Sequence, residues 1–474
     1  MSKSRPTLGH YLAYGGFRLF ETVLALLPLG LCATLGALMG RVAHCALPPY
    51  RNLVRRNLRI AFEGERTEGE IRDLAAKHFA TLGANLLSSI KLTTMRGEDV
   101  VRRLEVVGVE KIQPVVEEGR GIIYLISHLG AWEILAQVGA IAPQIERSTL
   151  YQPLSNPLLD AHVRGRRERL GTKTFDRKDG FNAPIQLLRS GGGVGVLVDQ
   201  HAGDKGTWCP FFGRLASTSN LAPLMAARTG AAMFPIGVAT VDRGRWRMTV
   251  GDAISVGRSE GVELATARMN LEVEKVIRAS PEDWFWVHNR WKIPHPRFLL
   301  NSYRRGITLP PGMGVGDLKR FRIVVRSPNP LGDACMSVPA VRAIKRGRPD
   351  CELAVLCPEN LVGFWGRVSD VDTVIPRPKS ASNRAVGKSL SEAGPFDVAV
   401  LLPNSPRSAI EAKHAHIPRI VGYPAKWRDR LVDQKIPPRD ATAGPRPHHA
   451  NHYLKIARCA GADLSDKTIF DPPH

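Results

Sequence analysis

His128 and Glu133 are the first side chains whose types and spacing suggest chemistry. His128 follows the apolar run GIIYLIS (121–127), which predicts a buried strand, and Glu133 precedes an apolar stretch that predicts a helix. Residues five apart lie about 140° apart around a helix, so the two can meet only if the chain breaks between them, as Gly130 allows. An imidazole held by a carboxylate can take a proton from an attacking hydroxyl, which predicts His128 as base and Glu133 as its orienting partner. The alternative is a loop histidine beside a helix-capping glutamate.

A cluster of arginines could bind a phosphate-bearing substrate. Its members crowd one segment and its continuation, namely Arg164, Arg166, Arg167, Arg169 and Arg177. Guanidinium groups bind phosphate through two parallel hydrogen bonds, and a solvated basic face is the alternative.

A carboxylate and an amide, Asp199 and Gln200, follow a second apolar run, VGVLV (194–198). Ligands of α/β sheets bind outside the carboxyl ends of the strands. We therefore expect this pair to bind substrate, and an ordinary turn aspartate is the alternative.

Five motifs in order resemble one enzyme family over roughly residues 10–300. They are ISHLGAWE (126–133), YQPLSNPLLD (151–160), RRERLG (166–171), VDQHAGDKGTWCPFFGR (198–214) and WFWVHNRWK (284–292). This set is similar to the lipid A biosynthesis lauroyl/myristoyl acyltransferases, which are bacterial inner-membrane enzymes related to the glycerol-phosphate acyltransferases. The resemblance implies transfer of a fatty acyl chain from acyl carrier protein, or from coenzyme A, to a hydroxyl of a lipid A precursor.

The resemblance also implies roles for particular residues. The HxxxxE pair of His128 and Glu133 is expected to be catalytic, and Asp199 with Gln200 to bind substrate. Arg167 is the expected functional arginine, with Arg169 and Arg177 as alternatives. Phe211, Phe212 and Gly213 are expected to shape the acyl or acceptor pocket, although a phenylalanine pair more often lies in a core. We expect no cofactor and no metal.

Three tryptophans near the end of this region, Trp284, Trp286 and Trp291, alternate with basic residues. The pattern indicates either a belt at a membrane interface or a packed helix.

The segment Thr22 to Gly40 carries no charge over 19 residues and has basic residues on both sides. It predicts an uncleaved membrane anchor, either spanning the bilayer or lying in its interface, with the basic flanks on anionic headgroups. A buried core helix is the alternative. The seven cysteines are dispersed and form no CxxC motif, which favours reduced thiols and predicts neither a disulfide framework nor a zinc site. We therefore expect the inner membrane, with the catalytic domain on its cytoplasmic side.

The composition bounds the possible classes of protein. The chain has 474 residues, of which 43% are hydrophobic and 23% are charged, so it is neither mostly disordered nor a polytopic membrane protein. Lys and Arg number 66 against 44 Asp and Glu, and the net charge of +22 favours anionic partners. Nucleic acid is not expected as a partner, because the positive charge lies beside an apolar anchor and no binding motif occurs.

A second α/β unit follows a Gly- and Pro-rich linker at residues 303–318. Five apolar runs alternate with helix-like segments and predict a parallel, Rossmann-like sheet, at residues 321–327, 351–357, 371–377, 396–403 and 419–424. The motifs SPNPLGD (327–333) and FDVAVLLPNSPRSA (396–409) resemble the acceptor-side half of lipopolysaccharide heptosyltransferases. That resemblance implies Asp333 as the base that activates an acceptor hydroxyl. The sequence ends at His474, where the nucleotide-sugar half of that family would begin, so we expect sugar transfer only with a donor domain from another chain.

The expected fold class is therefore α/β, with a membrane-anchored domain like that of the glycerol-phosphate acyltransferases followed by a Rossmann-like half of a glycosyltransferase. The expected divisions are an anchor and basic flank (1–60), an acyltransferase domain (61–302), a linker (303–318) and a heptosyltransferase-like domain (319–474). Acyl transfer to a lipid A precursor is the leading function. Core heptose transfer and non-catalytic binding of anionic lipid are the alternatives.

Overall fold

The computed structural model describes residues 6–137, 145–257, 259–303, 305–425, 427–438 and 448–472. The chain forms two compact units. The first comprises residues 1–202, 206–291 and 308–311, and the second comprises residues 203–205, 292–307 and 312–474. The predicted linker at 303–318 is thus shared between the two units.

The uncharged segment 22–40 lies in two helices. α1 (Leu8–Leu26) and α2 (Leu29–Ala46) are separated at Leu27 and Pro28. Proline has no N–H to donate and disfavours a helical residue before it, so the first helix ends there. Of the described helices, α2 alone is long and apolar enough to cross a membrane, a property shared by buried core helices and signal sequences. Membrane attachment therefore stays a prediction.

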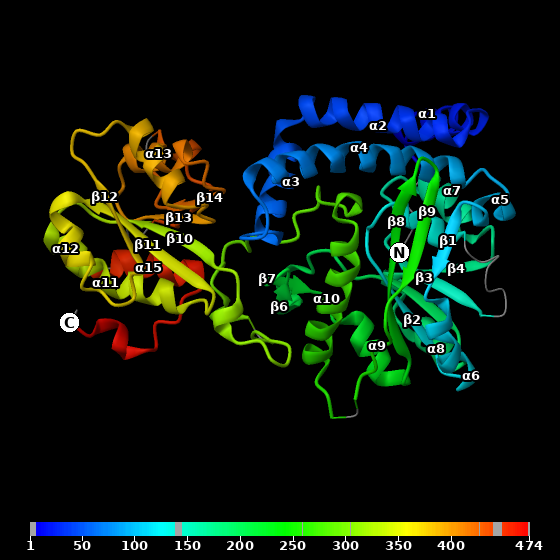
Figure 1. The fold of residues 1–474 in the computed structure, drawn as a ribbon. Coiled ribbons are helices and arrows are strands. Elements are labelled where there is room, and N and C mark those ends of the chain that lie inside the picture. The colour runs from blue at the N-terminus through cyan, green and yellow to red at the C-terminus, as the bar shows by residue number, and fades with distance from the viewer. Residues whose placement is uncertain are drawn as a thin grey trace. The chain divides into compact units, whose positions relative to one another are not determined.

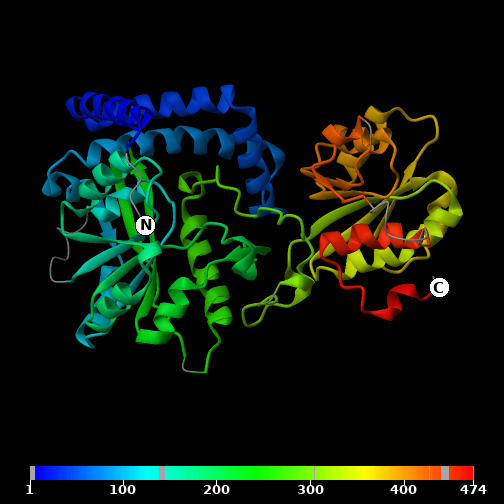
Figure 2. The same cartoon turned by 180° about the vertical axis from the view of Figure 1, so that it is seen from behind.

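One face of α2 packs closely on α4 (Glu68–Leu92), and Figures 1 and 2 show the two helices side by side from opposite directions. The approach depends on glycine, because a Cβ added to Gly36 would lie 2.2 Å from the carbonyl oxygen of Gly83. The opposite face of α2 is exposed and apolar, with Leu31, Leu35, Leu38, Met39 and Val42.

The first unit is built on a seven-stranded sheet in the order β1-β9-β8-β2-β5-β3-β4. Its strands are β1 (Leu104–Val107), β2 (Ile122–Ile126), β3 (Arg147–Tyr151), β4 (Thr172–Asp176), β5 (Gly193–Leu197), β8 (Ala232–Asp242) and β9 (Arg245–Val250). All neighbours are parallel except β8 and β9. The two apolar runs that predicted buried strands form β2 and β5, so those predictions are confirmed. A separate hairpin joins β6 (Thr207–Phe211) to β7 (Arg214–Thr218).

Successive side chains of β2 pack into the cores on opposite faces of the sheet, because side chains alternate from one face to the other along a strand. Ile123 and Leu125 belong to the core shared with α4, α9 (Leu221–Thr229) and α10 (Val262–Ala279). Ile122 belongs to the core on the opposite face, together with Ile112 and Val115. The remaining helices of this unit are α3 (Pro48–Ala61), α5 (Gly97–Val101), α6 (Gln113–Glu117), α7 (Pro157–Glu168) and α8 (Asn182–Arg189).

The second unit contains a six-stranded sheet in the order β12-β11-β10-β13-β14-β15, with every pair parallel. Its strands are β10 (Phe321–Arg326), β11 (Cys351–Pro358), β12 (Thr373–Arg377), β13 (Val398–Leu401), β14 (Arg419–Gly422) and β15 (Gln434–Lys435). Its helices are α11 (Leu331–Arg346), α12 (Val362–Trp365), α13 (Asn383–Ala393), α14 (Pro406–His414) and α15 (Ala450–Ala460). This is the strand order of a Rossmann-like sheet, with its topological switch point between β10 and β13. The five predicted strands and their parallel arrangement are confirmed.

Candidate active site

His128 and Asp199 meet at the carboxyl edge of the first sheet. β2 and β5 are parallel neighbours with Ile126 opposite Leu197, and each functional residue lies two positions beyond the end of its strand. The Nδ1 atom of His128 lies 2.7 Å from Oδ1 of Asp199. The other carboxylate oxygen of Asp199 accepts hydrogen bonds from the backbone N–H of His128 and from Nε1 of Trp284, each at 2.7 Å.

The charges of Asp199 and His128 determine which nitrogen of the imidazole ring carries the proton. Burial alone would raise the pKa of Asp199, but the charge and hydrogen bond of His128 outweigh it and lower that pKa to about 2. An ionised carboxylate only accepts hydrogen bonds, so Nδ1 of His128 carries the proton and donates it. Burial alone would lower the pKa of His128, but the charge of Asp199 raises it overall. Nε2 is therefore the basic atom of the neutral ring.

Glu133 does not hold the imidazole, which corrects the role predicted from the HxxxxE spacing. It lies in a 3₁₀ helix at Trp132–Ala136 and accepts two hydrogen bonds from Arg167 of α7, at 2.9 Å from Nε and 2.5 Å from the terminal nitrogen. The predicted break at Gly130 does occur, with φ +55° and a backbone that approaches Val238 too closely for a Cβ. Because the neighbouring strand already brings Asp199 to Nδ1, the carboxylate of Glu133 is left to bind the arginine fork.

His128 faces a cavity of about 800 Å³, a size typical of small-molecule sites. Its Nε2 lies 3.3 Å from the amide nitrogen of Gln200, and its ring contacts those of Trp132 and Phe285. Apolar side chains line much of the cavity, including Val109, Ile112, Val116, Ile126, Ile236 and Val250. A basic imidazole at the wall of an apolar cavity can take a proton from a group that is bound there.

The structure brings together most of the predicted site residues. His128, Glu133, Arg167, Arg177 and Gln200 line the cavity, and Asp199 lies behind His128. Arg169 is not among the residues that line the cavity, and it bonds to the carbonyl of Met95 and to the side chain of Gln137. Its predicted role as a phosphate ligand in this site is therefore not supported by its position.

The phenylalanine pair does not shape the cavity. Phe211 and Phe212 are 1% and 0% exposed, and their rings pack against Trp284, Trp286 and Trp291. Gly213 occupies the β6–β7 turn with φ +74°. The pocket role predicted for this motif is wrong, because the hairpin places both rings in the core. The tryptophans are buried in that core and lie outside the helices, so neither a membrane belt nor a packed helix describes them.

Two contributors to the site were not predicted. Trp284 donates a hydrogen bond to Asp199, and Tyr124 lines the cavity together with Arg164, which belongs to the predicted arginine cluster. Tyr124 could have been found from the period of its strand, since it shares a face with Ile122 and Ile126. Burial raises the pKa of Tyr124 to about 12, so its hydroxyl stays protonated. No pattern of neighbouring residues in the sequence indicates the contact of Trp284 with Asp199, because the two residues are 85 positions apart.

Within the described ranges, no group of three or more His, Cys, Asp and Glu side chains could hold a metal ion. Among the described residues, the cavity offers a histidine that can transfer a proton and arginines that can bind anions.

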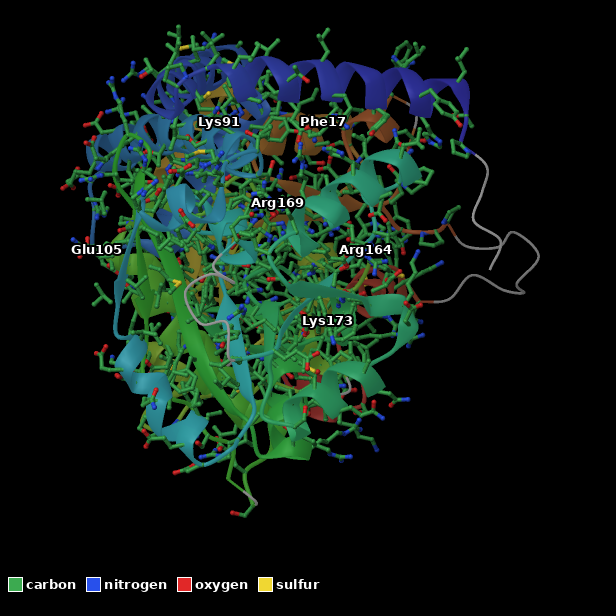
Figure 3. The ribbon with its side chains drawn as sticks, turned by 90° about the vertical axis from the view of Figure 1, so that its right-hand side faces the viewer. Phe17, Lys91, Glu105, Arg164, Arg169 and Lys173 are labelled. Carbon is green, nitrogen blue, oxygen red and sulfur yellow. The ribbon has the colours of Figure 1, made fainter. Side chains whose placement is uncertain are left out.

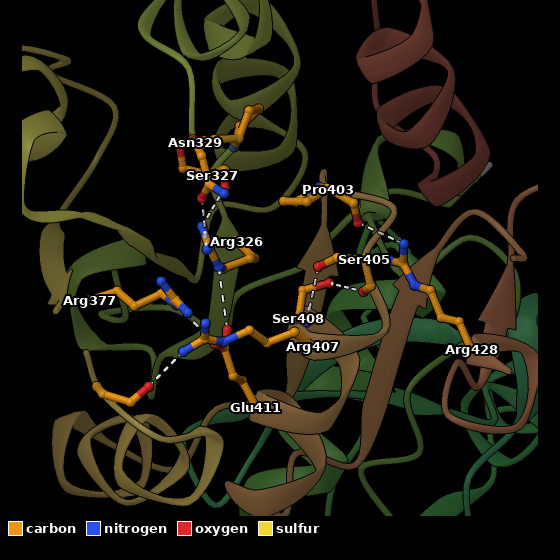
Figure 4. Close-up of polar contacts among 12 residues, drawn as sticks. Arg326, Ser327, Asn329, Arg377, Pro403, Ser405, Arg407, Ser408, Glu411 and Arg428 are labelled. Atoms are coloured by element: carbon orange, nitrogen blue, oxygen red, sulfur yellow. Dashed lines mark hydrogen bonds and ion pairs between the residues drawn. The ribbon is translucent and has the colours of Figure 1, made fainter. Parts of the chain in front are cut away.

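The second unit has its own polar cluster at the carboxyl ends of its strands (Figure 4). Glu411, which is 1% exposed, accepts hydrogen bonds from Arg326, Arg377 and Arg407. Three guanidinium groups thus share one carboxylate. Asp333, in the first turn of α11, lies 3.1 Å from Nδ1 of His449.

Arg428 lies nearby and is fully buried, and it donates to the carbonyl of Pro403. Burial lowers the pKa of Arg428 to about 10. Together with the Glu411 cluster, it gives this edge of the sheet more cationic than anionic groups.

Comparison with known proteins gives one family for the first unit. A family model described as bacterial lipid A biosynthesis acyltransferase matches residues 3–293. The lipid A biosynthesis lauroyltransferase of Escherichia coli (strain K12) is 28% identical over 270 residues, which are 56% of this chain and 87% of that protein. The lipid A biosynthesis myristoyltransferase of the same organism is 26% identical over 282 residues, which are 58% of this chain and 83% of that protein.

The second unit is similar to different proteins. Lipopolysaccharide heptosyltransferase 2 of Salmonella typhimurium (strain LT2) is 28% identical over 159 residues, which are 32% of this chain and 44% of that protein. The solved structure of E. coli ADP-heptose lps heptosyltransferase II matches with 29% identity and a TM-score of 0.26, over 29% of this chain and 40% of that chain. This chain therefore spans less than half the length of either of these two heptosyltransferases.

Proposed function

Because this chain belongs to the bacterial lipid A biosynthesis acyltransferase family, we propose that it moves a fatty acyl chain from a thioester of acyl carrier protein or coenzyme A to a hydroxyl of a lipid A precursor. The observation that supports this most is the His128–Asp199 pair, whose basic Nε2 faces an apolar cavity. In the proposed reaction, Nε2 takes the hydroxyl proton while the oxygen attacks the thioester carbonyl. The carbon–sulfur bond then breaks, and the sulfur leaves as a thiol with the proton returned by the imidazolium.

Mass spectrometry of lipid A tests this function directly. Cells that carry the gene should contain a lipid A species heavier by one acyl chain than cells that lack it. A gene encoding His128→Ala should not restore that species, since the base is missing. An unchanged lipid A profile in the deletion strain would contradict the proposed acceptor, whereas a changed profile also identifies the acyl chain.

We further propose that α1 and α2 hold the protein on the cytoplasmic side of the inner membrane. Both helices expose large apolar side chains, among them Leu12, Leu19, Leu26, Leu31 and Val42. The neighbouring basic residues, such as Arg41 and Arg51, suit anionic headgroups. Fractionation of the same cells should recover the protein with membranes until detergent is added, and recovery in the soluble fraction without detergent would contradict the attachment.

Arg167 is proposed to bind a phosphate of the acceptor or of the donor's pantetheine arm while it remains close to Glu133. Lysine keeps the charge but loses the planar fork, so Arg167→Lys should lower kcat/KM by about tenfold or more. Arg169→Lys is the matched control, because that residue does not line the cavity, and it should have a much smaller effect. An equal loss of kcat/KM in the two variants would contradict the phosphate-binding role proposed for Arg167.

For the second unit we propose binding of the saccharide part of the same lipid, and the cationic surplus around Glu411 supports an acidic sugar as ligand. Arg407 is the most exposed member at 45%, so it can reach a ligand. Arg407→Gln should raise KM about tenfold for an acceptor with acidic core sugars, the loss expected for one charged hydrogen bond, and leave KM unchanged without them. Lys388→Gln, at an exposed position of α13, is the control. Identical KM changes for both acceptors would contradict this role.

Sugar transfer through Asp333 is the second candidate for this unit, and the Asp333–His449 contact favours it. It predicts that Asp333→Asn abolishes heptose transfer and leaves acyl transfer intact. Absence of heptose transfer by the unmodified chain, with and without a donor domain from another chain, would exclude it.

A further inference from the structure

α1 has two distinct faces. His10, Tyr14, Phe17 and Glu21 recur at spacings of four, three and four residues, which places them on one side of the helix. The other side is exposed and apolar, and carries Leu8, Leu12, Leu19, Val23 and Leu26. Glu21 is the single acidic residue of this helix and is only 3% exposed. A buried carboxylate in an apolar helix needs partners to offset its lost hydration.

The partners of Glu21 come mainly from α7. One carboxylate oxygen lies 3.0 Å from Nε2 of His162 and accepts a hydrogen bond of 3.2 Å from Nε of Arg166. The other oxygen pairs with Arg18 of the same helix at 3.2 Å. His162 and Arg166 are four residues apart, so they lie one above the other on one face of α7.

Two further contacts tie α7 to the same face of α1. Asn156 caps the start of α7 and also donates a hydrogen bond of 3.0 Å to the carbonyl of His10. The ring of His162 packs edge-on against Tyr14 and Phe17. In Figure 3, Phe17 lies between the α1 ribbon and the segment that carries Arg164 and Arg169.

A neighbouring side of α7 belongs to the candidate active site. Val163 and Arg167 follow His162 and Arg166 by one residue each, which turns them about 100° around the helix axis. Both line the cavity, and Arg167 binds Glu133 there. No side chain of α7 is fully buried, so polar contacts contribute to holding this helix in place.

We propose that Glu21 is a positioning residue for acyl transfer, which through His162 and Arg166 holds α7 so that Arg167 stays in place at the cavity beside Glu133. The inference rests on the proposed function. It makes the apolar helix α1 a structural part of the active site, in addition to the membrane attachment proposed above.

A double-mutant cycle tests this inference on the full-length enzyme in detergent micelles, where membrane attachment does not limit the rate. Glu21→Gln should lower kcat/KM by about tenfold in an otherwise unchanged chain. In an enzyme that already carries Arg167→Ala, the same substitution should lower kcat/KM little further. The effects of two substitutions do not add when one residue acts through the other. Glu98→Gln, the same substitution at an exposed position of α5, is the control and should not change the rate. An equal loss in both backgrounds, or no loss in either, overturns the proposal.

Hydrogen exchange provides a readout that does not depend on activity. Glu21→Gln should speed amide exchange in residues 157–168, whereas Glu98→Gln should not. If the Glu21→Gln variant does not fold, the variants His162→Gln and Arg166→Gln are used in its place in both measurements. Each of them removes one of the contacts of Glu21. Unchanged exchange in α7 overturns the inference even if the unmodified enzyme transfers acyl chains. An unmodified enzyme without acyl transfer but with faster exchange in the variant contradicts the proposed function and leaves the α1–α7 attachment established.

Discussion

Replacement of His128 by alanine is expected to lower kcat by about 10²–10⁴-fold, which is the contribution typical of a general base. The substitution removes the basic Nε2 that faces the cavity, while the apolar walls of the cavity remain. KM should therefore change much less than kcat. The measurement is acyl transfer by purified enzyme in detergent, with a thioester donor and a lipid A precursor.

His414→Ala provides the matched control, because His414 is exposed on α14 and lies outside the cavity. It should leave both constants unchanged. A folded His128→Ala enzyme with nearly normal kcat would contradict the proposed mechanism, whatever the result for the control.

Replacement of Asp199 by asparagine is expected to lower kcat by a similar factor of about 10²–10⁴, because the base then loses its orientation. The side chain keeps its size but loses the charge that Nδ1 of His128 and Nε1 of Trp284 share. An asparagine amide can also donate to Nδ1, which would leave the proton on Nε2 and block its action as a base.

The same variant should also change the pH dependence of kcat/KM, and the direction of this change can be predicted. His128 acts as a base only when unprotonated, so kcat/KM of the unmodified enzyme should fall as pH drops through a pKa that Asp199 raises above the ordinary 6.5. Without the carboxylate, burial dominates and favours the neutral ring. The acid limb of Asp199→Asn should therefore move to lower pH, although the maximum rate is smaller.

Asp252→Asn is the control for this prediction, because Asp252 is 81% exposed and pairs only with Lys111 among the described contacts. It should change neither the rate nor the acid limb. If Asp199→Asn keeps the acid limb of the unmodified enzyme, then Asp199 does not set the pKa of the base.

Much of the fold could be predicted from local patterns. The apolar runs at 121–127 and 194–198 became β2 and β5, and the five runs after residue 320 became a parallel sheet. These predictions succeed because a strand buried on both faces needs an unbroken apolar run, which is a property of adjacent residues. The α1–α2 break at Pro28 is local in the same way, since it depends on one residue without an N–H.

The partner of His128 could not be predicted in this way. The HxxxxE spacing indicated Glu133, which is five residues distant, whereas Nδ1 is held by Asp199, which is 71 residues distant. Only the pairing of β2 with β5, in the register that sets Ile126 opposite Leu197, brings the imidazole and that carboxylate to one edge. The burial of Phe211 and Phe212 likewise depends on where the β6–β7 hairpin packs.

The amino-acid sequence thus shows which residue types follow the strands: a histidine, an aspartate and a glutamine, with arginines on a following helix. Which of these side chains touch depends on the folded arrangement of the chain. In the folded protein Asp199 lies at Nδ1 of the imidazole and Gln200 lies near Nε2, while Glu133 pairs with Arg167. The physical reason is that strand order, register and helix docking are contacts between segments far apart in the chain, and no local spacing of residues encodes them.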